Sequence, residues 1–524
     1  MADKEAPTDW QPEIEEMQQR RRLAAQMGGE EAVARHHAAG KLTVRERIER
    51  LLDPGSFHEL GSLAGRAEEK DGKLASFRPA NFVMGLGTVD GRKVVVGGED
   101  FTVRGGAADA AVGGKWTFAE RMADEWRLPI IRLIDGTGGS VRTLELIGRT
   151  YIPDNPGVVT MARLLGKIPV VSAVMGSVAG LPAAKAVLAH WTIMVKDTSQ
   201  VFVAGPPVVR RGMGEEVTKE VLGSHQVHAY KSGVVDNVAE DEEDCFRQIR
   251  RFLSYLPSSV WQTPPRTEPT DDPDRREEAL FSIIPRDRRC PYDVRKMLDL
   301  IVDRDSLFEI TPHYGRSLVT TFARLNGYPV GVMANDPMHL GGALDAAASE
   351  KLMRFVDLCD TFHLPVVNFV DQPGFMVGTA AELQGTIRKG ARALCAVEES
   401  TIPWIAVMVR KCYGVAGGAH GRHGGLNLRY AWPSAEWGSL PVEGGVEAAY
   451  RREIEAAPDP DEKRRELEEK LNELRSPLRT AEAFGVEEMI DPRDTRSLLC
   501  QFVEIAQELV HTEIGPKWRF GMRP

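Results

Sequence analysis

The residues best suited to chemistry in this chain are glycines that follow apolar, strand-like segments. Glycine lets a backbone amide come close to a ligand, and α/β proteins bind ligands at the carboxyl ends of their parallel strands. Such glycines stand in the first half at Gly105-Gly106, Gly138-Gly139 and Gly180, and in the second half at Gly341-Gly342, Gly374, Gly378 and Tyr413–Gly418. This pattern predicts a site built from backbone donors.

Side-chain catalysts are missing from the recognisable motifs. The sequence has no G-x-S-x-G elbow, no G-x-x-x-x-G-K-[ST] phosphate loop, no paired-carboxylate motif and no G-x-G-x-x-G with an acidic partner. Fixed N–H groups at a helix start stabilise negative charge on an oxygen, and one such donor is typically worth ~10² to 10³ in rate. The expected reaction therefore passes through an oxyanion.

An internal repeat explains why the glycines occur twice. The first stretch recurs, 236 positions later, with Gly105, Gly106, Asp109, Lys115, Leu128, Pro129 and Asp135 returning as Gly341, Gly342, Asp345, Lys351, Leu364, Pro365 and Asp371. An earlier stretch recurs at an offset of 250, with Val44, Arg45, Asp53, Ser56 and Glu59 returning as Val294, Arg295, Asp303, Ser306 and Glu309. The chain therefore holds two homologous domains, and its site is built twice or between them.

The elements that position these glycines are predicted to alternate between strand and helix. Apolar runs on both sides of Asp90-Gly91 and of Asn326-Gly327 predict tight hairpins. A helix is expected over 109–126, an apolar strand over 128–135 and a further helix over 157–166. Strand, helix and strand with a glycine-rich exit are typical of a parallel α/β fold.

Composition along the chain sets the expected domain limits. Residues 1–265 are predicted to form the first domain, the Pro-rich and charged residues 266–285 a linker, and 286–524 the second domain. The charged opening to about residue 40 suits a helix on the body or against another subunit, and 459–475 suits a solvated helix.

The overall balance of residues excludes several classes of protein. Hydrophobic content of 42%, charged content of 27% and a net charge of −10 suit a globular protein and argue against a general nucleic-acid binder. No apolar run reaches the ~18 to 20 residues of a membrane span. The acidic opening lacks the character of a signal or transit peptide, so a cytoplasmic location is expected.

The cysteines do not suggest a metal site. All six are scattered, without C-x-x-C and without histidine at ligand spacing, at positions 245, 290, 359, 395, 412 and 500. We expect them to be small buried hydrophobes and expect no intrinsic metal.

At these motifs the sequence resembles the carboxyltransferase β subunits of biotin-dependent acyl-CoA carboxylases, nearest to those of propionyl-CoA and methylcrotonyl-CoA. The matching motifs follow one another along nearly the whole chain at Gly40–Phe57, Asp100–Gly106, Val195–Pro206, Lys231–Val235, Val332–Pro337, Asp371–Phe375, Lys411–Gly414 and Ala431–Pro433. The resemblance implies an α/β fold of two tandem crotonase-like domains. It also implies a hexamer with active sites between the first domain of one subunit and the second domain of another.

The same resemblance implies the reaction and its partners. Carboxybiotin, carried on a biotin carboxylase/biotin carboxyl carrier (α) subunit, releases CO₂, and the free biotin nitrogen takes the α-proton of an acyl-CoA. The thioester enolate then attacks the CO₂. Biotin is not expected on this chain, which lacks a Met-Lys-Met biotinylation motif.

The residues that the resemblance assigns to the site act mainly through their amides. One oxyanion hole falls at Gly180 and Leu181 in the acyl-CoA domain, and the other at Val415 and Ala416 in the biotin domain. The residues expected to line the substrate are Gly105, Gly106, Lys115, Gly138, Gly139, Gly374, Phe375, Gly417 and Gly418. His420 and His423 are expected in a solvated loop.

Several residues depart from the family pattern. Relatives commonly carry Gly-Gly and Gly-Ala at the two holes, whereas this chain has Leu181 followed by Pro182, and Val415. Valine adopts a positive φ with difficulty and proline has no amide. Gly417 and Gly418 replace the Tyr-Asp of propionyl-CoA carboxylases, which predicts a larger and less polar acyl pocket.

Two alternatives to a carboxylase remain open at this point. The first is the carboxyltransferase of a biotin-dependent decarboxylase or transcarboxylase, which runs the same half-reaction in reverse. The second is a non-catalytic β-like subunit that completes a mixed hexamer, which the substitutions at both holes would explain.

Overall fold

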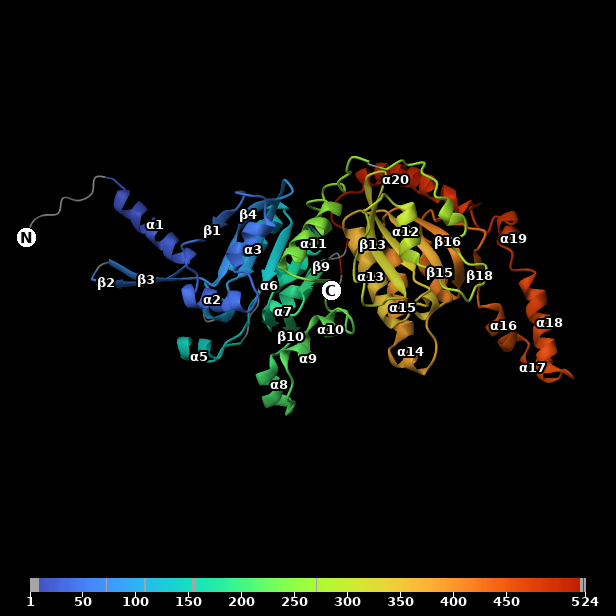
Figure 1. Ribbon diagram of the computed structural model, residues 1–524, viewed down its shortest axis with the longest axis horizontal. Helices are drawn as coiled ribbons and strands as arrows, with labels where there is room; N and C mark the ends of the chain where they lie inside the picture. Colours follow the sequence, from blue (N-terminus) through green and yellow to red (C-terminus); the bar gives the residue numbers. More distant parts are fainter. Residues whose placement is uncertain are drawn as a thin grey trace, which may run out of the picture. The chain divides into compact units, whose positions relative to one another are not determined.

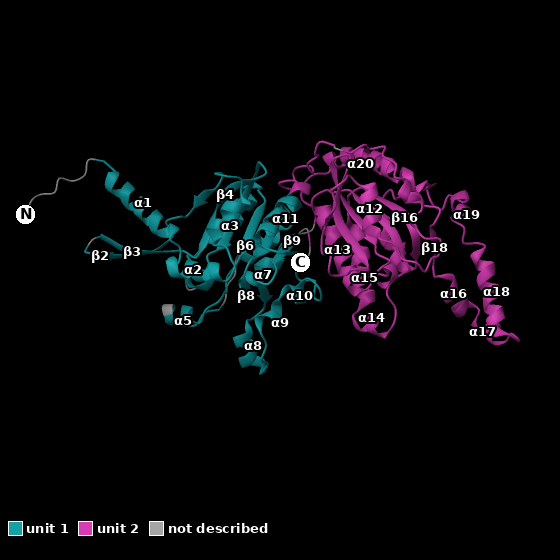
Figure 2. Cartoon of the chain, in the orientation of Figure 1, with its two compact units in different colours: residues 1–253, 524 teal, residues 254–523 magenta. Residues whose placement is uncertain are grey.

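The chain folds into two compact units. The computed structural model describes residues 9–518 and 522, with gaps at 72, 108–109, 153–156 and 270. Unit 1 extends to Leu253 and unit 2 begins at Ser254 (Figure 2). The prediction from composition placed this boundary later, with a linker at 266–285. Within that range, Arg275 donates to the carbonyls of Leu300 (3.2 Å) and Val302 (2.8 Å) of unit 2.

Unit 1 is built on a seven-stranded sheet in the order β1-β4-β5-β6-β7-β9-β11 (Figure 1). The strands are β1 (His58–Leu60), β4 (Phe82–Val89), β5 (Arg92–Glu99), β6 (Ile130–Ile134), β7 (Val170–Val174), β9 (Trp191–Val195) and β11 (Asn237–Ala239). The first three are antiparallel, and from β5 onward every pairing is parallel. Two small parallel strands, β8 (Ser177–Ala179) and β10 (Gln200–Phe202), pair separately, and β2 (Gly65–Lys70) with β3 (Lys73–Pro79) form a hairpin.

Unit 2 repeats this plan in an eight-stranded sheet in which β18 pairs with β16 beside the main order β12-β13-β14-β15-β16-β17-β19. Its strands are β12 (Phe308–Glu309), β13 (Leu318–Leu325), β14 (Tyr328–Asn335), β15 (Val366–Gln372), β16 (Trp404–Tyr413), β17 (Leu428–Ala431), β18 (Glu436–Gly438) and β19 (Glu488–Met489). β4, β5 and β6 begin 236 residues before β13, β14 and β15. The structure therefore confirms the α/β repeat.

Helices flank both sheets. In unit 1 they are α1 (Gln11–Ala25), α2 (Glu30–Ala38), α3 (Val44–Leu51), α4 (Lys115–Trp126), α5 (Arg142–Ile147), α6 (Gly157–Leu164), α7 (Leu181–Val187), α8 (Pro206–Met213), α9 (Lys219–Gly223), α10 (His225–His228) and α11 (Glu242–Tyr255). From α12 onward they are α12 (Val294–Ile301), α13 (Ala346–Thr361), α14 (Thr379–Leu383), α15 (Thr386–Glu399), α16 (Val442–Ala449), α17 (Arg451–Glu455), α18 (Pro460–Asn472), α19 (Pro477–Glu482) and α20 (Thr495–Thr512). Short 3₁₀ turns are η1 (Arg104–Gly106), η3 (Glu278–Phe281), η4 (Leu340–Gly342), η5 (Val415–His420) and η6 (Pro492–Asp494).

Both predicted hairpins form with the same turn chemistry. All four turn residues, in Asp90-Gly91 and Asn326-Gly327, have positive φ, as a tight two-residue hairpin requires. The carboxylate of Asp53 accepts the N–H groups of the first pair (3.0 and 2.9 Å), and that of Asp303 accepts those of the second (3.1 and 2.8 Å). The residues that recur at an offset of 250 therefore hold the turns that recur at 236.

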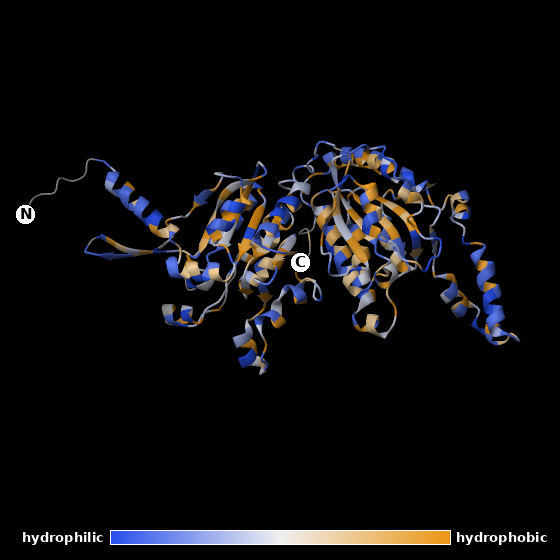
Figure 3. Ribbon diagram, viewed as in Figure 1, coloured by the Kyte–Doolittle hydropathy of each residue, from blue (hydrophilic) through white to orange (hydrophobic). Residues whose placement is uncertain are grey.

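The cores lie where the parallel strands are covered on both faces. Every residue of β6, β7 and β9 is buried, which suits their continuous apolar sequences (Figure 3). The charged helix α18, expected to be solvated, packs one face through Leu467 against Val446 of α16 and Ile454 of α17.

Two buried histidines make the folded state sensitive to acid. His36 is 6% exposed and His363 is 2% exposed. Burial, assisted by Lys41 in the first case and by Lys517 in the second, lowers the pKa of each to about 4. Both side chains are therefore neutral in the native protein near neutral pH.

We expect the free energy of unfolding to fall as pH drops from about 7 to about 5. In that interval the unfolded chain protonates both histidines near pH 6.5 while the folded chain does not, so each costs about 2 kcal/mol at pH 5. Thermal unfolding followed by circular dichroism measures the loss. The His363→Gln variant should lose less, and a pH-independent midpoint would contradict the prediction.

Candidate oxyanion turns at the strand exits

The first candidate hole lies where α7 begins. Gly180 has φ 66° and caps the helix, and Leu181 is the first helical residue. The Gly180 amide donates to the carbonyl of Val203 (3.3 Å), whereas the Leu181 amide has no acceptor among the described residues. Pro182 sits in the first turn, where a missing N–H breaks no helical bond. The amides of this turn that lack an acceptor among the described residues are therefore those of Leu181 and Ala183.

The second candidate hole repeats this geometry after β16. Gly414 has φ 66° and precedes η5, and its amide donates to the carbonyl of Gly438 (3.1 Å). In the described part of the chain no acceptor meets the amides of Val415 and Ala416. Val415 is 67% exposed, while Ala416 is buried.

The departures at Leu181 and Val415 are compatible with this backbone. Neither residue has a positive φ, because Gly180 and Gly414 adopt the left-handed conformation in front of them. The two turns still differ, since Pro182 stands where Ala416 offers a second N–H. The turns thus differ in which amides lack an acceptor among the described residues, namely those of the first and third helical residues in unit 1 and of the first and second in unit 2.

The structure brings other predicted glycines to the first turn. A parallel bridge joins Ala107, after Gly105 and Gly106, to Gly138. A Cβ on Gly138 would lie 2.7 Å from the carbonyl oxygen of Ala179 and 3.5 Å from the amide nitrogen of Leu181. Only glycine allows this approach. Gly139, next along the chain, faces open space.

Unit 2 has a matching arrangement around Gly374. The bridge between Leu344 and Phe375 repeats that of unit 1, and the Leu344 amide donates to the Gly374 carbonyl (3.1 Å). A Cβ on Gly417 would meet the Cys412 sulfur at 3.3 Å, whereas one on Gly418 has ordinary contacts, the nearest at 3.5 Å. The pair therefore lies in η5, immediately after the free amides.

Lys115 lies apart from these turns in its described contacts. Its side chain approaches Gly61, and its pKa is lowered to about 8 by burial, with Glu59 acting in the opposite direction and Arg45 adding to the lowering. No ion pair of Lys115 is seen among the described residues. Its expected place in the lining of the substrate site remains a prediction.

Buried carboxylates at the strand ends hold both sites, a role that sequence reasoning missed. Asp135 is fully buried after β6, with Lys41 Nζ at 2.7 Å and Arg47 Nη1 at 3.0 Å. Asp371, near the end of β15, is 1% exposed and binds Arg410 Nη2 at 3.0 Å. The repeat pointed to both aspartates, but their cationic partners come from unrelated positions.

Because Asp135 and Asp371 have different cationic partners, one position in unit 1 must be glycine. Gly176 and Arg410 each lie four residues before a capping glycine, Gly180 or Gly414, and therefore occupy equivalent positions in the two units. A Cβ on Gly176 would lie 1.8 Å from Asp135 Oδ1 and 2.6 Å from Lys41 Nζ. Lys41 fills the space that the arginine uses in the other unit.

A second buried pair, also missed, lies behind the first turn. Lys185 of α7 approaches Glu99 Oε1 at 3.1 Å, and both side chains are nearly buried. Glu99 also accepts the amide of Asp135 (3.4 Å), as Asn335 accepts that of Asp371 (3.1 Å). The residue of unit 2 that corresponds to Glu99 is therefore the uncharged Asn335. Only a comparison of the two repeats could have revealed this loss of charge.

The histidines at and beyond the end of η5, His420 and His423, are not both solvated. His423 pairs with Glu398 (2.6 Å) in an exposed position. The ring of His420 points inward to the Gly417 carbonyl, and burial lowers its pKa to about 4. Among the described residues no group of three or more His, Cys, Asp or Glu side chains is arranged to hold a metal.

Comparison with known proteins assigns the chain to a family. A family model described as carboxyl transferase domain matches residues 35–519. The chain belongs to the carboxyl transferase family. The propionyl-CoA carboxylase, carboxyltransferase subunit, of Haloferax mediterranei is 39% identical over 496 residues, which cover 93% of this chain and 94% of that relative.

Two further matches bear on the reaction and the fold. The methylmalonyl-CoA decarboxylase subunit alpha of Veillonella parvula is 36% identical over 475 residues, covering 90% of this chain and 91% of the relative. A crystal structure of transcarboxylase 12S, described as a hexamer assembly with methylmalonyl-CoA and methylmalonic acid bound, matches with a TM-score of 0.87 at 32% identity and covers 99% of each chain. These findings confirm the resemblance and the two crotonase-like domains. No helix in the described part of this carboxyl transferase is both long and apolar enough to span a bilayer.

The two capping glycines provide a test of the turns. We expect Gly180→Ala and Gly414→Ala each to cost about 1 to 3 kcal/mol in stability, because side chains rarely adopt φ near 66° with ψ of −131° or −161°. The rate of carboxyl transfer should fall more than this loss of stability explains, since the next amide moves. Gly29→Ala is the matched control, because Gly29 also caps a helix N-terminus with positive φ (φ 89°, ψ 166°) and faces open space. Equal activity in all three variants would contradict the assignment.

Proposed function

We propose that the protein is the carboxyltransferase component of a biotin-dependent acyl-CoA carboxylase. The observation that carries the proposal is the duplicated turn, in which a left-handed glycine is followed by an amide without a protein acceptor among the described residues. Membership of the carboxyl transferase family supports the same activity. Unit 1 is proposed to bind the acyl-CoA, and unit 2 to bind biotin.

The residues of the two turns fit the charges that develop in this reaction. When bound, carboxybiotin supplies CO₂ and a ureido nitrogen that serves as the base. The Leu181 amide is proposed to stabilise the thioester oxygen as the α-proton leaves, which the closeness of Gly138 at the neighbouring strand exit supports. The Val415 and Ala416 amides are proposed to stabilise the ureido oxygen. Orphan N–H groups at a helix start provide this stabilisation without reorganisation.

Partners follow from the same proposal. The chain carries no Met-Lys-Met sequence, so biotin is proposed to arrive on a biotin carboxylase/biotin carboxyl carrier subunit. A homo-oligomer, hexameric like the transcarboxylase 12S assembly, would place unit 1 of one chain opposite unit 2 of another. A cytoplasmic location remains a prediction.

The direction of transfer has two candidates. The carboxylase subunit of Haloferax mediterranei and the decarboxylase subunit of Veillonella parvula differ by only three percentage points in identity to this chain. The same pair of turns stabilises the same charges in either direction, so a decarboxylase or transcarboxylase is the second candidate. The non-catalytic alternative loses its main argument, because Leu181 and Val415 need no positive φ.

Carboxyl transfer from methylmalonyl-CoA to free biotin tests the proposal directly. We expect the assembled protein to release propionyl-CoA in a biotin-dependent manner. Val415→Pro, which removes one N–H at a position where helical turns accept proline, should lose ~10² to 10³ in kcat. Val415→Ala, which keeps the amide, is the control and should stay near the wild type. Full activity in the proline variant would refute the role of this amide.

The acyl pocket yields a second prediction. Gly418 has room for a side chain, so Gly418→Asp should fold normally and restrict the pocket. Each buried methylene is worth ~0.8 kcal/mol, so we expect the wild type to favour acyl groups longer than propionyl by about tenfold and the variant to lose this preference. Rates with acetyl-, propionyl-, butyryl- and methylcrotonyl-CoA measure it.

Gly444→Asp, in open space on α16, controls for the added charge. Fastest turnover with acetyl-CoA, unchanged by Gly418→Asp, would show that this position does not set acyl length.

A further inference from the structure

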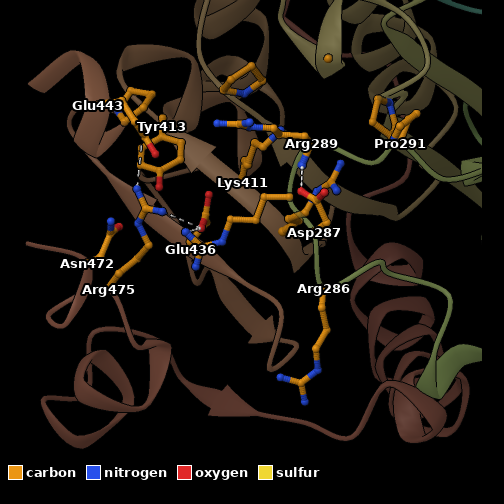
Figure 4. A pocket seen from close by; sticks show the side chains of 16 residues that line it. Arg286, Asp287, Arg289, Pro291, Lys411, Tyr413, Glu436, Glu443, Asn472 and Arg475 are labelled. Carbon is orange, nitrogen blue, oxygen red and sulfur yellow. Dashed lines mark hydrogen bonds and ion pairs between the residues drawn. The ribbon is translucent and has the colours of Figure 1, made fainter. Parts of the chain in front are cut away.

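A cationic pocket of about 780 Å³ opens within unit 2, beside the end of β16 (Figure 4). Its lining includes six cationic side chains and three carboxylates. The cations are Arg286, Arg288, Arg289, Arg410, Lys411 and Arg475. The chain as a whole has a net charge of −10, so the local excess of positive charge runs against the average of the protein. Such a concentration of charge attracts anions.

Two of these cations are already engaged in holding the fold. Arg410 binds Asp371 and donates to the Cys290 carbonyl (2.9 Å). Arg288 pairs with Glu436 at 2.7 Å. By contrast, the side chains of Arg286, Arg289 and Lys411 make no hydrogen bond or ion pair with any described side chain.

Arg475 is held at the pocket wall without being fully satisfied. Its side chain is 8% exposed, and its contacts to Glu436 (3.7 Å) and Glu443 (3.6 Å) are longer than direct hydrogen bonds. Its Nε is buried and finds no acceptor in the described residues. Figure 4 shows this guanidinium between Tyr413 and Glu436. The terminal nitrogens of this guanidinium, which make only these long contacts, therefore remain available as donors at the pocket wall.

We propose that this pocket binds a small molecule that carries two phosphate groups. Guanidinium groups match phosphate oxygens in bidentate geometry, and the volume is that of a ligand pocket for a nucleotide-sized molecule. This site lies outside the two oxyanion turns and is additional to the proposed carboxyl transfer. Tyr413, in its wall, directly precedes Gly414. A ligand bound in this pocket would therefore lie next to the residue that directly precedes the second turn.

Two sources supply this chemistry, namely a free nucleotide or pyrophosphate, and the 3′-phosphorylated nucleotide end of a CoA molecule. Isothermal titration of the assembled full-length protein with pyrophosphate and with 3′,5′-ADP separates them. We expect pyrophosphate to bind at one site per chain, weakened by added salt, and for 3′,5′-ADP we assign to this pocket only the binding that the pocket variants weaken, because the proposed acyl-CoA site of unit 1 also accepts this probe. Stronger binding of pyrophosphate identifies the first source, and stronger binding of 3′,5′-ADP the second.

Variants connect the binding to the pocket. Arg286→Ala and Arg289→Ala remove exposed, unpaired side chains, so both should fold as the wild type and bind about tenfold more weakly. Arg210→Ala, on exposed α8 of unit 1, is the matched control and should bind normally. The proposal is overturned if neither probe binds at millimolar concentration. It is equally overturned if the pocket variants bind as tightly as the control.

Discussion

A buried carboxylate at a strand end is the constraint on which both halves of this protein depend. Asp135 and Asp371 lie at the exits from which the ligand-facing loops depart, and both are almost completely buried. An ionised group in such a place survives only with close cationic partners, and removing one partner of a buried pair costs roughly 3 to 5 kcal/mol. The partners, Arg47 with Lys41 in one unit and Arg410 in the other, thereby tie separate segments together. Loop positions near the turns are fixed by this pairing.

The capping glycines act on that rigid base. In each unit the glycine donates its own amide to a neighbouring carbonyl, Val203 or Gly438, and this bond sets the direction of the next N–H group. A hydrophobic side chain at Leu181 or Val415 is then compatible with the turn, because neither residue has a positive φ. Two roles are thus divided between neighbouring residues. The glycine bends the backbone, and the residue after it carries the free N–H group. This division explains how the family motif tolerates larger residues here.

Much of this organisation follows from sequence, because it depends on local rules or on the repeat. Asp90-Gly91 and Asn326-Gly327 predicted hairpins that form, and the constant offset predicted matching strands. Contacts between residues distant in sequence could not be predicted from the sequence. Composition marks residues 266–285 as a linker, but it gives no sign that Arg275 binds the carbonyls of Leu300 and Val302. Likewise, the pairing of Lys185 with Glu99 joins two positions that carry no periodic signal.

The exchange between Gly176 and Arg410 has a historical consequence. An arginine introduced at 176 would collide with the ammonium of Lys41, and loss of Arg410 would strand the charge of Asp371. Each unit is stable only when its buried aspartate keeps its own cationic partners. No single substitution converts one set into the other without an unstable intermediate. After a duplication, the two halves therefore could not have exchanged single residues at this position, although each could diverge at positions outside the buried pair.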